Sequence, residues 1–161
     1  MKAVEISKTG GAEVLEVKDT TLDKPSSDEV TIEQKAIGLN YIDTYHRSGL
    51  YPIKLPSGLG LEGAGVITEV GENVKNFKVG DKISYAGIPL GSYSTHRNYP
   101  TKNLVKVQDG IDLEVAATLM TKGLTTFYLF TKLIQLNLAK QYYFMLRLVV
   151  LDKFLANGQK V

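Results

Sequence analysis

Few residues of this chain could carry out chemistry by themselves. The sequence contains no cysteine, which excludes a thiolate nucleophile, a disulfide framework and a cysteine-ligated zinc site. Of its two histidines, His46 falls on a short polar segment, and His96 has no carboxylate at a spacing typical of catalysis. We therefore interpret both as ordinary structural residues.

Asn40 and Asp43 form the clearest polar pair. Asparagine is favoured at a helix N-cap, and an acidic residue three positions later is a variant of the capping box. This pattern predicts a helix from Tyr41 to Arg47 that stops at Gly49. On the sequence alone, Asn40 is a helix cap, with or without a second role, and Asp43 is its reciprocal partner.

The elements around this helix are mainly β. Residues 30–36 alternate apolar and polar side chains, and residues 64–70 are rich in β-branched residues. Further strands are predicted after the turn at residues 79–81, over 91–96 and over 103–107. Short strands separated by glycines indicate a small barrel or sandwich.

The last third of the chain differs in composition. A second helix is predicted to begin near Asp112, a favourable N-cap, and to continue through Met120. From Leu129 to Leu155 the sequence has neither glycine nor proline. Its apolar runs, such as residues 148–151, are far shorter than the roughly 20 residues of a membrane span, so no membrane partner is expected.

Length and charge limit the function classes. A chain of 161 residues fits one domain or slightly more, and its hydrophobic share of 43% excludes a disordered protein. Lys and Arg number 19 against 17 Asp and Glu, so the net charge of +2 gives no electrostatic case for nucleic acid. Residues 1–6 lack the apolar run of a signal peptide, and we expect a cytoplasmic protein.

Three stretches in order carry a family resemblance: residues 35–45, 47–52 and 55–65. With Val79-Gly80-Asp81 and Lys122-Gly123-Leu124-Thr125, they resemble the bacterial quinone oxidoreductases, in the zinc-free ζ-crystallin-like branch of the medium-chain dehydrogenase/reductases. The resemblance extends from Met1 to about Leu129. It implies a mainly β (α+β) fold, with a GroES-like β-barrel over residues 1–122 and a C-terminal helix.

The resemblance also implies an activity. Members of this family carry a Rossmann domain after the barrel, bind NADPH between the two, and pass its hydride to quinones or related electrophiles. The zinc-dependent relatives have a cysteine at the position of Asn40 and a histidine at that of Leu61. Because neither residue here can ligate zinc in that way, no metal site is expected.

Roles for individual residues follow from the same resemblance. It implies cofactor binding by Asn40, Asp43, Tyr45 and Thr125, and it makes Tyr45 and Tyr51 candidate catalytic residues. Asn40 and Thr125 would hydrogen-bond the ribose or carboxamide, and the tyrosines would stack on, or donate to, cofactor and quinone. Without the resemblance, both tyrosines would be ordinary half-buried aromatics.

The resemblance stops before the glycine-rich turn that holds the cofactor pyrophosphate in this family. When plausible codons for residues 144–151 are read one base earlier, they encode FHAAAGGVG, the family's turn. We therefore predict that residues 123–161 are a linker helix followed by an out-of-frame tail, with a base lost near the codons for Phe130 or Thr131. A natural C-terminal helix is the alternative.

Two functional hypotheses remain. In the first, the chain descends from an NADPH:quinone oxidoreductase, lacks the Rossmann domain, binds no NADPH alone and is inactive. In the second, it is a stand-alone, non-catalytic GroES-like binding module. In either case, apolar residues of the tail, if exposed, would favour self-association.

Overall fold

A computed structural model of the chain describes residues 1–133, and the predicted out-of-frame tail lies outside the described residues apart from its first few positions. The chain divides into two compact units, Met1–Thr121 and a second unit that begins at Lys122.

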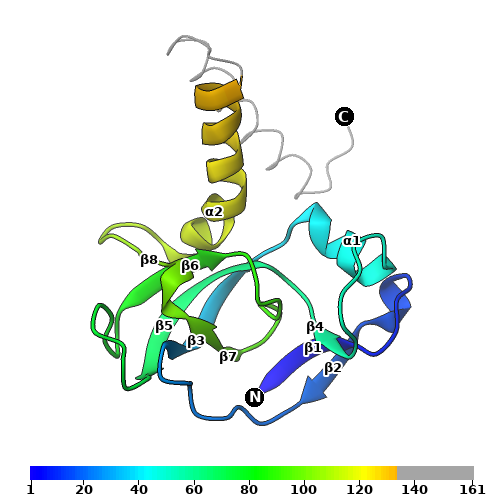
Figure 1. The fold of residues 1–161 in the computed structure, drawn as a ribbon, viewed down its shortest axis with the longest axis horizontal. Coiled ribbons are helices and arrows are strands. Elements are labelled where there is room, and N and C mark those ends of the chain that lie inside the picture. The colour runs from blue at the N-terminus through cyan, green and yellow to red at the C-terminus, as the bar shows by residue number, and fades with distance from the viewer. Residues whose placement is uncertain (134–161) are drawn as a thin grey trace. The chain divides into compact units, whose positions relative to one another are not determined.

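Antiparallel strands form two sheets in the first unit (Figure 1). The smaller sheet has the order β2-β1-β4 and consists of β1 (Lys2–Ile6), β2 (Glu16–Asp19) and β4 (Ser57–Gly58). The larger has the order β7-β3-β5-β6-β8 and consists of β3 (Glu29–Gly38), β5 (Glu62–Val70), β6 (Lys82–Ala86), β7 (His96–Pro100) and β8 (Leu104–Lys106). The mainly β prediction is therefore confirmed.

The barrel is the point on which the structure differs from expectation, because the two sheets do not close into one. A short irregular segment joins them instead. The Tyr93 carbonyl accepts the Val4 amide of β1 at 2.8 Å, whereas the Thr95 carbonyl accepts the Gln34 amide of β3 at 2.9 Å. This junction segment, residues 92–95, bonds to both sheets, but within residues 1–133 it forms only one isolated antiparallel bridge, Ala3 to Ser94, and no continuous ladder. The strand predicted over 91–96 consequently starts only at His96.

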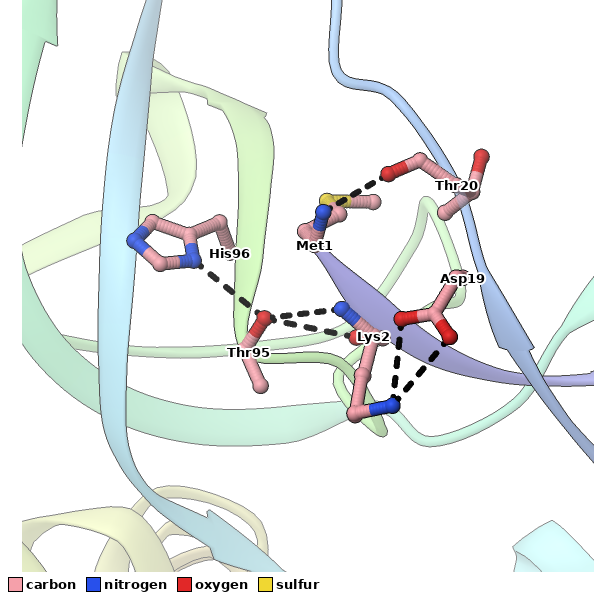
Figure 2. Close-up of polar contacts among 6 residues, drawn as sticks. All are labelled: Met1, Lys2, Asp19, Thr20, Thr95 and His96. Carbon is pink, nitrogen blue, oxygen red and sulfur yellow. Dashed lines mark hydrogen bonds and ion pairs between the residues drawn. The ribbon is translucent and has the colours of Figure 1, made fainter.

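Polar contacts at the start of the chain strengthen this junction (Figure 2). The Lys2 amide donates to Thr95 Oγ1 at 3.1 Å, and the Thr95 amide donates to the Lys2 carbonyl at 2.8 Å. The Met1 amino group donates to the Thr20 carbonyl at 2.7 Å, and Lys2 Nζ lies 3.1 Å from Asp19 Oδ1. These bonds fix β1 against both β2 and the junction segment.

Alternating apolar residues build the core of each sheet. The main cluster lies on the larger sheet and comprises Val30, Ile32, Ile67, Ile83, Tyr85, Tyr99 and Leu104. A smaller cluster comprises Ile6, Val14 of the 3₁₀ turn η1 (Ala12–Val14) and Leu59. Each fully buried aliphatic side chain contributes about 1.5–3 kcal/mol relative to exposure. The alternation in residues 30–36 thus selects the face of β3 that is buried.

Both predicted helices are present. Helix α1 spans Tyr41–Ser48 and ends at Gly49, whose positive φ of 86° is the left-handed geometry that glycine tolerates. Helix α2 spans Leu113–Tyr128 and begins after Asp112. A 3₁₀ turn, η2 (Thr101–Asn103), precedes β8, and a π-helical turn, η3 (Leu129–Leu133), follows α2. Among residues 1–133, no helix is both long and apolar enough to cross a bilayer.

Small residues seat the first part of α2 on the sheet. Ala116 and Ala117 are buried and pack in one cluster with Ala64 of β5. Gly38, the last residue of β3, allows the closest approach: a Cβ atom there would lie 2.3 Å from the Ala117 carbonyl oxygen. Side chains this small let the helix backbone approach the strand ends directly.

Candidate functional site

The N-terminus of α1 gathers the polar residues singled out in the sequence. Asn40 is the N-cap, and it forms a capping box with Asp43. Asp43 Oδ2 accepts the Asn40 backbone amide at 3.0 Å. Both side chains are buried, at 8% and 4% exposure. The cap predicted from the spacing is therefore confirmed, and it immobilises both residues.

A tyrosine far away in the sequence holds Asp43 from the other side. The Tyr93 hydroxyl, in the junction segment, donates to Asp43 Oδ2 at 2.7 Å. Burial raises the pKa of Tyr93 well above its ordinary value, and the hydrogen bond to the Asp43 carboxylate raises that pKa further. Both effects keep the phenol protonated, so it remains a donor to Asp43.

Asn40 makes a second contact that sequence reasoning did not assign. Its Nδ2 donates to Glu62 Oε2 at 2.8 Å, and Glu62 Oε1 accepts the Thr121 backbone amide of α2 at 2.8 Å. Glu62, the first residue of β5, is fully buried. The available signal was a lone carboxylate among glycines at the start of an apolar strand, a place where a charge is rarely left unpartnered.

Three tyrosines form an aromatic group, the tyrosine cluster, on and beside α1. The ring centroids of Tyr41 and Tyr45 are 5.3 Å apart, and those of Tyr45 and Tyr51 are also 5.3 Å apart. The structure thus brings together the two tyrosines singled out in the sequence and adds Tyr41. Tyr41 and Tyr51 are 76% and 47% exposed, so ring surface is available to a planar ligand.

The remaining sequence candidates lie elsewhere or remain predictions. Thr125 belongs to the second unit, where it is an exposed residue of α2, and its cofactor role stays a prediction. His46 packs near Tyr51, with centroids 6.1 Å apart. His96 contacts Thr95 Oγ1 at 3.2 Å. Within residues 1–133, neither histidine forms an ion pair with a carboxylate.

A cavity of about 340 Å³ lies apart from α1. None of the capping residues or clustered tyrosines lines it, and its charged groups are of both signs. The lining residues are Met1, Leu22, Asp23, Lys24, Thr31, Thr68, Glu69 and His96. With no preference for one charge and no α1 residue, the cavity is not the candidate site.

A buried arginine stabilises the loop that follows β6. Arg97 is only 5% exposed and donates to the Pro89 and Leu90 carbonyls at 2.7 and 3.2 Å. Its guanidinium also lies 4.6 Å from the centre of the Tyr99 ring. Within residues 1–133 no carboxylate forms an ion pair with it, so carbonyl dipoles and ring faces solvate its charge.

Comparison with known proteins identifies the domain. Residues 26–109 match the profile of the alcohol dehydrogenase GroES-like domain. A quinone oxidoreductase of Pseudomonas aeruginosa is 51% identical over 137 residues, which are 84% of this chain and 42% of that protein. The chain therefore spans about two fifths of the length of the curated relatives it matches.

Solved structures agree with this comparison. The Escherichia coli quinone oxidoreductase in complex with NADPH superposes with a TM-score of 0.80 at 45% identity, over 82% of this chain and 41% of that one. A Pseudomonas syringae quinone oxidoreductase superposes with a TM-score of 0.79 at 52% identity, over 81% and 41%. The GroES-like fold expected from the sequence is thus confirmed, although its sheets remain open.

Proposed function

The chain belongs to the family of alcohol dehydrogenase GroES-like domains, and we propose that it forms the catalytic-domain part of an NADPH-dependent quinone oxidoreductase. The identity to quinone oxidoreductases supports the reaction class, and the NADPH complex of the Escherichia coli relative supports the cofactor. The observation that carries the proposal is the buried Asn40 carboxamide at the N-cap of α1, the helix that also carries Tyr41 and Tyr45 of the tyrosine cluster.

The residues present fit the nicotinamide end of the cofactor. Asn40 Nδ2 carries two protons, and one of them is donated in the hydrogen bond to Glu62. Within residues 1–133 the other proton makes no hydrogen bond, which leaves a fixed donor for a carboxamide or ribose oxygen. The exposed rings of Tyr41 and Tyr51 offer flat apolar faces. A fixed polar group and aromatic surface carried by the same helix are features of a site that orients a planar ring.

The phosphate end has no comparable site in the described residues. Phosphates bind where a glycine-rich turn opens a helix N-terminus. Helix α1 begins with an acidic residue in its first turn, Asp43, and α2 follows Asp112 and carries Glu114 in its first turn. Carboxylates at these positions would repel a pyrophosphate.

The bound cofactor would supply the hydride, and the protein would supply position. Asn40 would orient the nicotinamide through its remaining amide proton, while Tyr45 and Tyr51 would hold the ring or the quinone and keep water from the reacting face. Holding two planar reactants in one geometry is the main contribution expected from such a site.

The 161-residue chain by itself is proposed to be inactive and metal-independent. Hydride transfer needs groups on both sides of the cofactor, and the described residues contribute one side. Asn40 and Leu61 occupy the positions at which zinc-dependent relatives carry ligands, and the Asn40 amide is already engaged by Glu62. No group of three His, Cys, Asp or Glu among residues 1–133 could hold a metal ion.

Ligand titration tests the proposal. Reduced nicotinamide mononucleotide, which lacks the adenosine half, should bind in the millimolar range, about 4 kcal/mol. It should shift the ¹⁵N-HSQC signals of Asn40 and Tyr45, and Tyr51→Ala should abolish the shifts. No binding of NADPH should be detectable at micromolar concentrations, and quinone-dependent oxidation of NADPH should be absent. Micromolar binding of NADPH with turnover would overturn the proposed inactivity. If reduced nicotinamide mononucleotide shifted no HSQC signal of α1, the proposed binding site would be overturned.

The alternative, a non-catalytic GroES-like binding module, is favoured by one observation. Three apolar side chains near the same helix are strongly exposed: Leu39, Tyr41 and Leu50. A surface of this kind also suits a protein partner. Protein binding that depends on Leu39 and Leu50, together with no response to the mononucleotide, would select this alternative.

A further inference from the structure

Glu62 is a fully buried carboxylate to which the proposed function assigns no role beyond its contact with Asn40. Its two oxygens have different partners from different elements: Asn40 Nδ2 at the start of α1, and the Thr121 backbone amide in α2. In the described residues no cation forms an ion pair with it. A buried charge held only by hydrogen bonds calls for a specific reason, because its desolvation is costly.

The reason lies in the chemistry of its partners. Asn40 Nδ2 and the Thr121 amide are both donors, so the side chain between them must accept at both ends. A carboxylate accepts at both oxygens. A glutamine of the same shape would place an NH₂ group against one donor and leave that pair unsatisfied.

The packing prevents the carboxylate from moving elsewhere. A Cβ atom added at Gly38 would lie 2.6 Å from Glu62 Oε2, which shows how closely the β3 backbone covers this oxygen. On the other side of Asn40, the capping box engages the side chain with the Asp43 backbone. The carboxamide is therefore held at both ends, with its oxygen toward α1 and its nitrogen toward Glu62.

We propose that Glu62 is a positioning residue, which fixes the orientation of the Asn40 carboxamide and couples it to the backbone of α2 at Thr121. This inference rests on the proposed function, in which Asn40 presents its remaining amide proton to the nicotinamide. Glu62 acts only through Asn40 and contacts no substrate. The arrangement requires a side chain that accepts at both ends, because it lies between two donors, Asn40 Nδ2 and the Thr121 amide.

A polarity swap in the full chain tests this. In Glu62→Gln, one donor faces the new NH₂ group. Adding Asn40→Asp supplies an acceptor there. The amide nitrogen introduced at position 62 then donates to the carboxylate introduced at position 40, and the amide oxygen at position 62 accepts from the Thr121 backbone amide. Glu69→Gln is the matched control, because Glu69 lies on the same strand and is exposed. Readouts are amide exchange at Thr121, unfolding in urea, and HSQC shifts with reduced nicotinamide mononucleotide.

We expect Glu62→Gln to speed exchange at Thr121 about tenfold and to weaken mononucleotide binding at least as much, while Glu69→Gln changes neither. The double variant should recover Thr121 protection and the urea midpoint but not binding, since the carboxamide is gone. If Glu62→Gln alone fails to fold, recovery of folding in the double variant supports the proposal.

Two results would overturn the inference: a double variant no better than Glu62→Gln, or unchanged mononucleotide binding in Glu62→Gln. Failure of the proposed function looks different. In that case the double variant restores stability, but the unmodified chain shows no HSQC shifts with the mononucleotide. The contact between Glu62 and Asn40 is then purely structural, and the positioning role is lost.

Discussion

The Tyr93 hydroxyl offers a test of how α1 is held in place. Tyr93→Phe removes one oxygen atom and leaves the ring packing in the smaller core cluster unchanged. Asp43, 4% exposed, loses the donor at 2.7 Å and keeps only the Asn40 backbone amide on the same oxygen. Among residues 1–133 Asp43 Oδ1 has no hydrogen-bond partner, so no second bond on that oxygen compensates for the loss.

The expected cost follows from the type of bond. A hydrogen bond to a charged group contributes about 1.5–3 kcal/mol. Taking about 2 kcal/mol, and about 3 °C per kcal/mol for a chain of this length, the melting temperature should fall by about 6 °C. Because Asp43 caps α1, exchange should also accelerate at the Asn40 amide.

Thermal unfolding followed by circular dichroism measures the effect. Tyr41→Phe is the matched control, since Tyr41 is 76% exposed and its hydroxyl makes no hydrogen bond within residues 1–133. It should change the melting temperature by less than about 2 °C. Equal losses in the two variants would refute the reasoning, because the Tyr93–Asp43 bond would then contribute nothing beyond a surface hydroxyl.

Other predictions concern pH, packing and the loop after β6. Burial is the first cause of the raised pKa in three tyrosines, Tyr85, Tyr93 and Tyr99. Their ordinary value of 10.0 applies to the unfolded chain, so the contribution of these tyrosines to stability should be constant below pH 10 and fall above it, as urea midpoints from pH 8 to 11.5 would show. Gly38→Ala should lower the free energy of unfolding by about 1–3 kcal/mol, because the added Cβ would lie 2.3 Å from the Ala117 carbonyl oxygen. Gly123→Ala is the control, because a Cβ there would meet open space. Equal urea midpoints for the two variants would contradict the packing argument. Arg97→Met should cost about 1–3 kcal/mol and speed exchange and proteolysis in residues 86–91, because the Pro89 and Leu90 carbonyls lose their donor. An unchanged cleavage rate would show that the loop does not depend on Arg97.

Local patterns in the sequence were enough for the elements that carry strong signals. Residues 30–36 and 64–70 lie within β3 and β5, and the Asn40–Asp43 spacing marks the start of α1, as Gly49 marks its end. These signals are local: a two-residue period selects a buried face, and capping needs atoms only three residues apart. The strands β1, β2 and β4 were not predicted; β4 has only two residues, and all three form by pairing with one another in the smaller sheet.

The site shows the same division. The Asn40–Asp43 pair and the tyrosines at 45 and 51 are close in the sequence, so their proximity could be predicted from it. Tyr93 lies 50 residues from Asp43, and Glu62 lies 22 residues from Asn40 and 59 from Thr121. No local rule relates these positions. They meet because strand pairing and the junction segment bring them together.

The sequence by itself therefore determined the mainly β class, the α1 helix and the residue types able to hold a planar ring. Only the tertiary structure decided that the sheets stay open and that a buried acceptor holds Asn40. The physical reason is that local preferences depend on a few neighbouring residues, whereas burial and the pairing of donors with acceptors are properties of the whole packed domain.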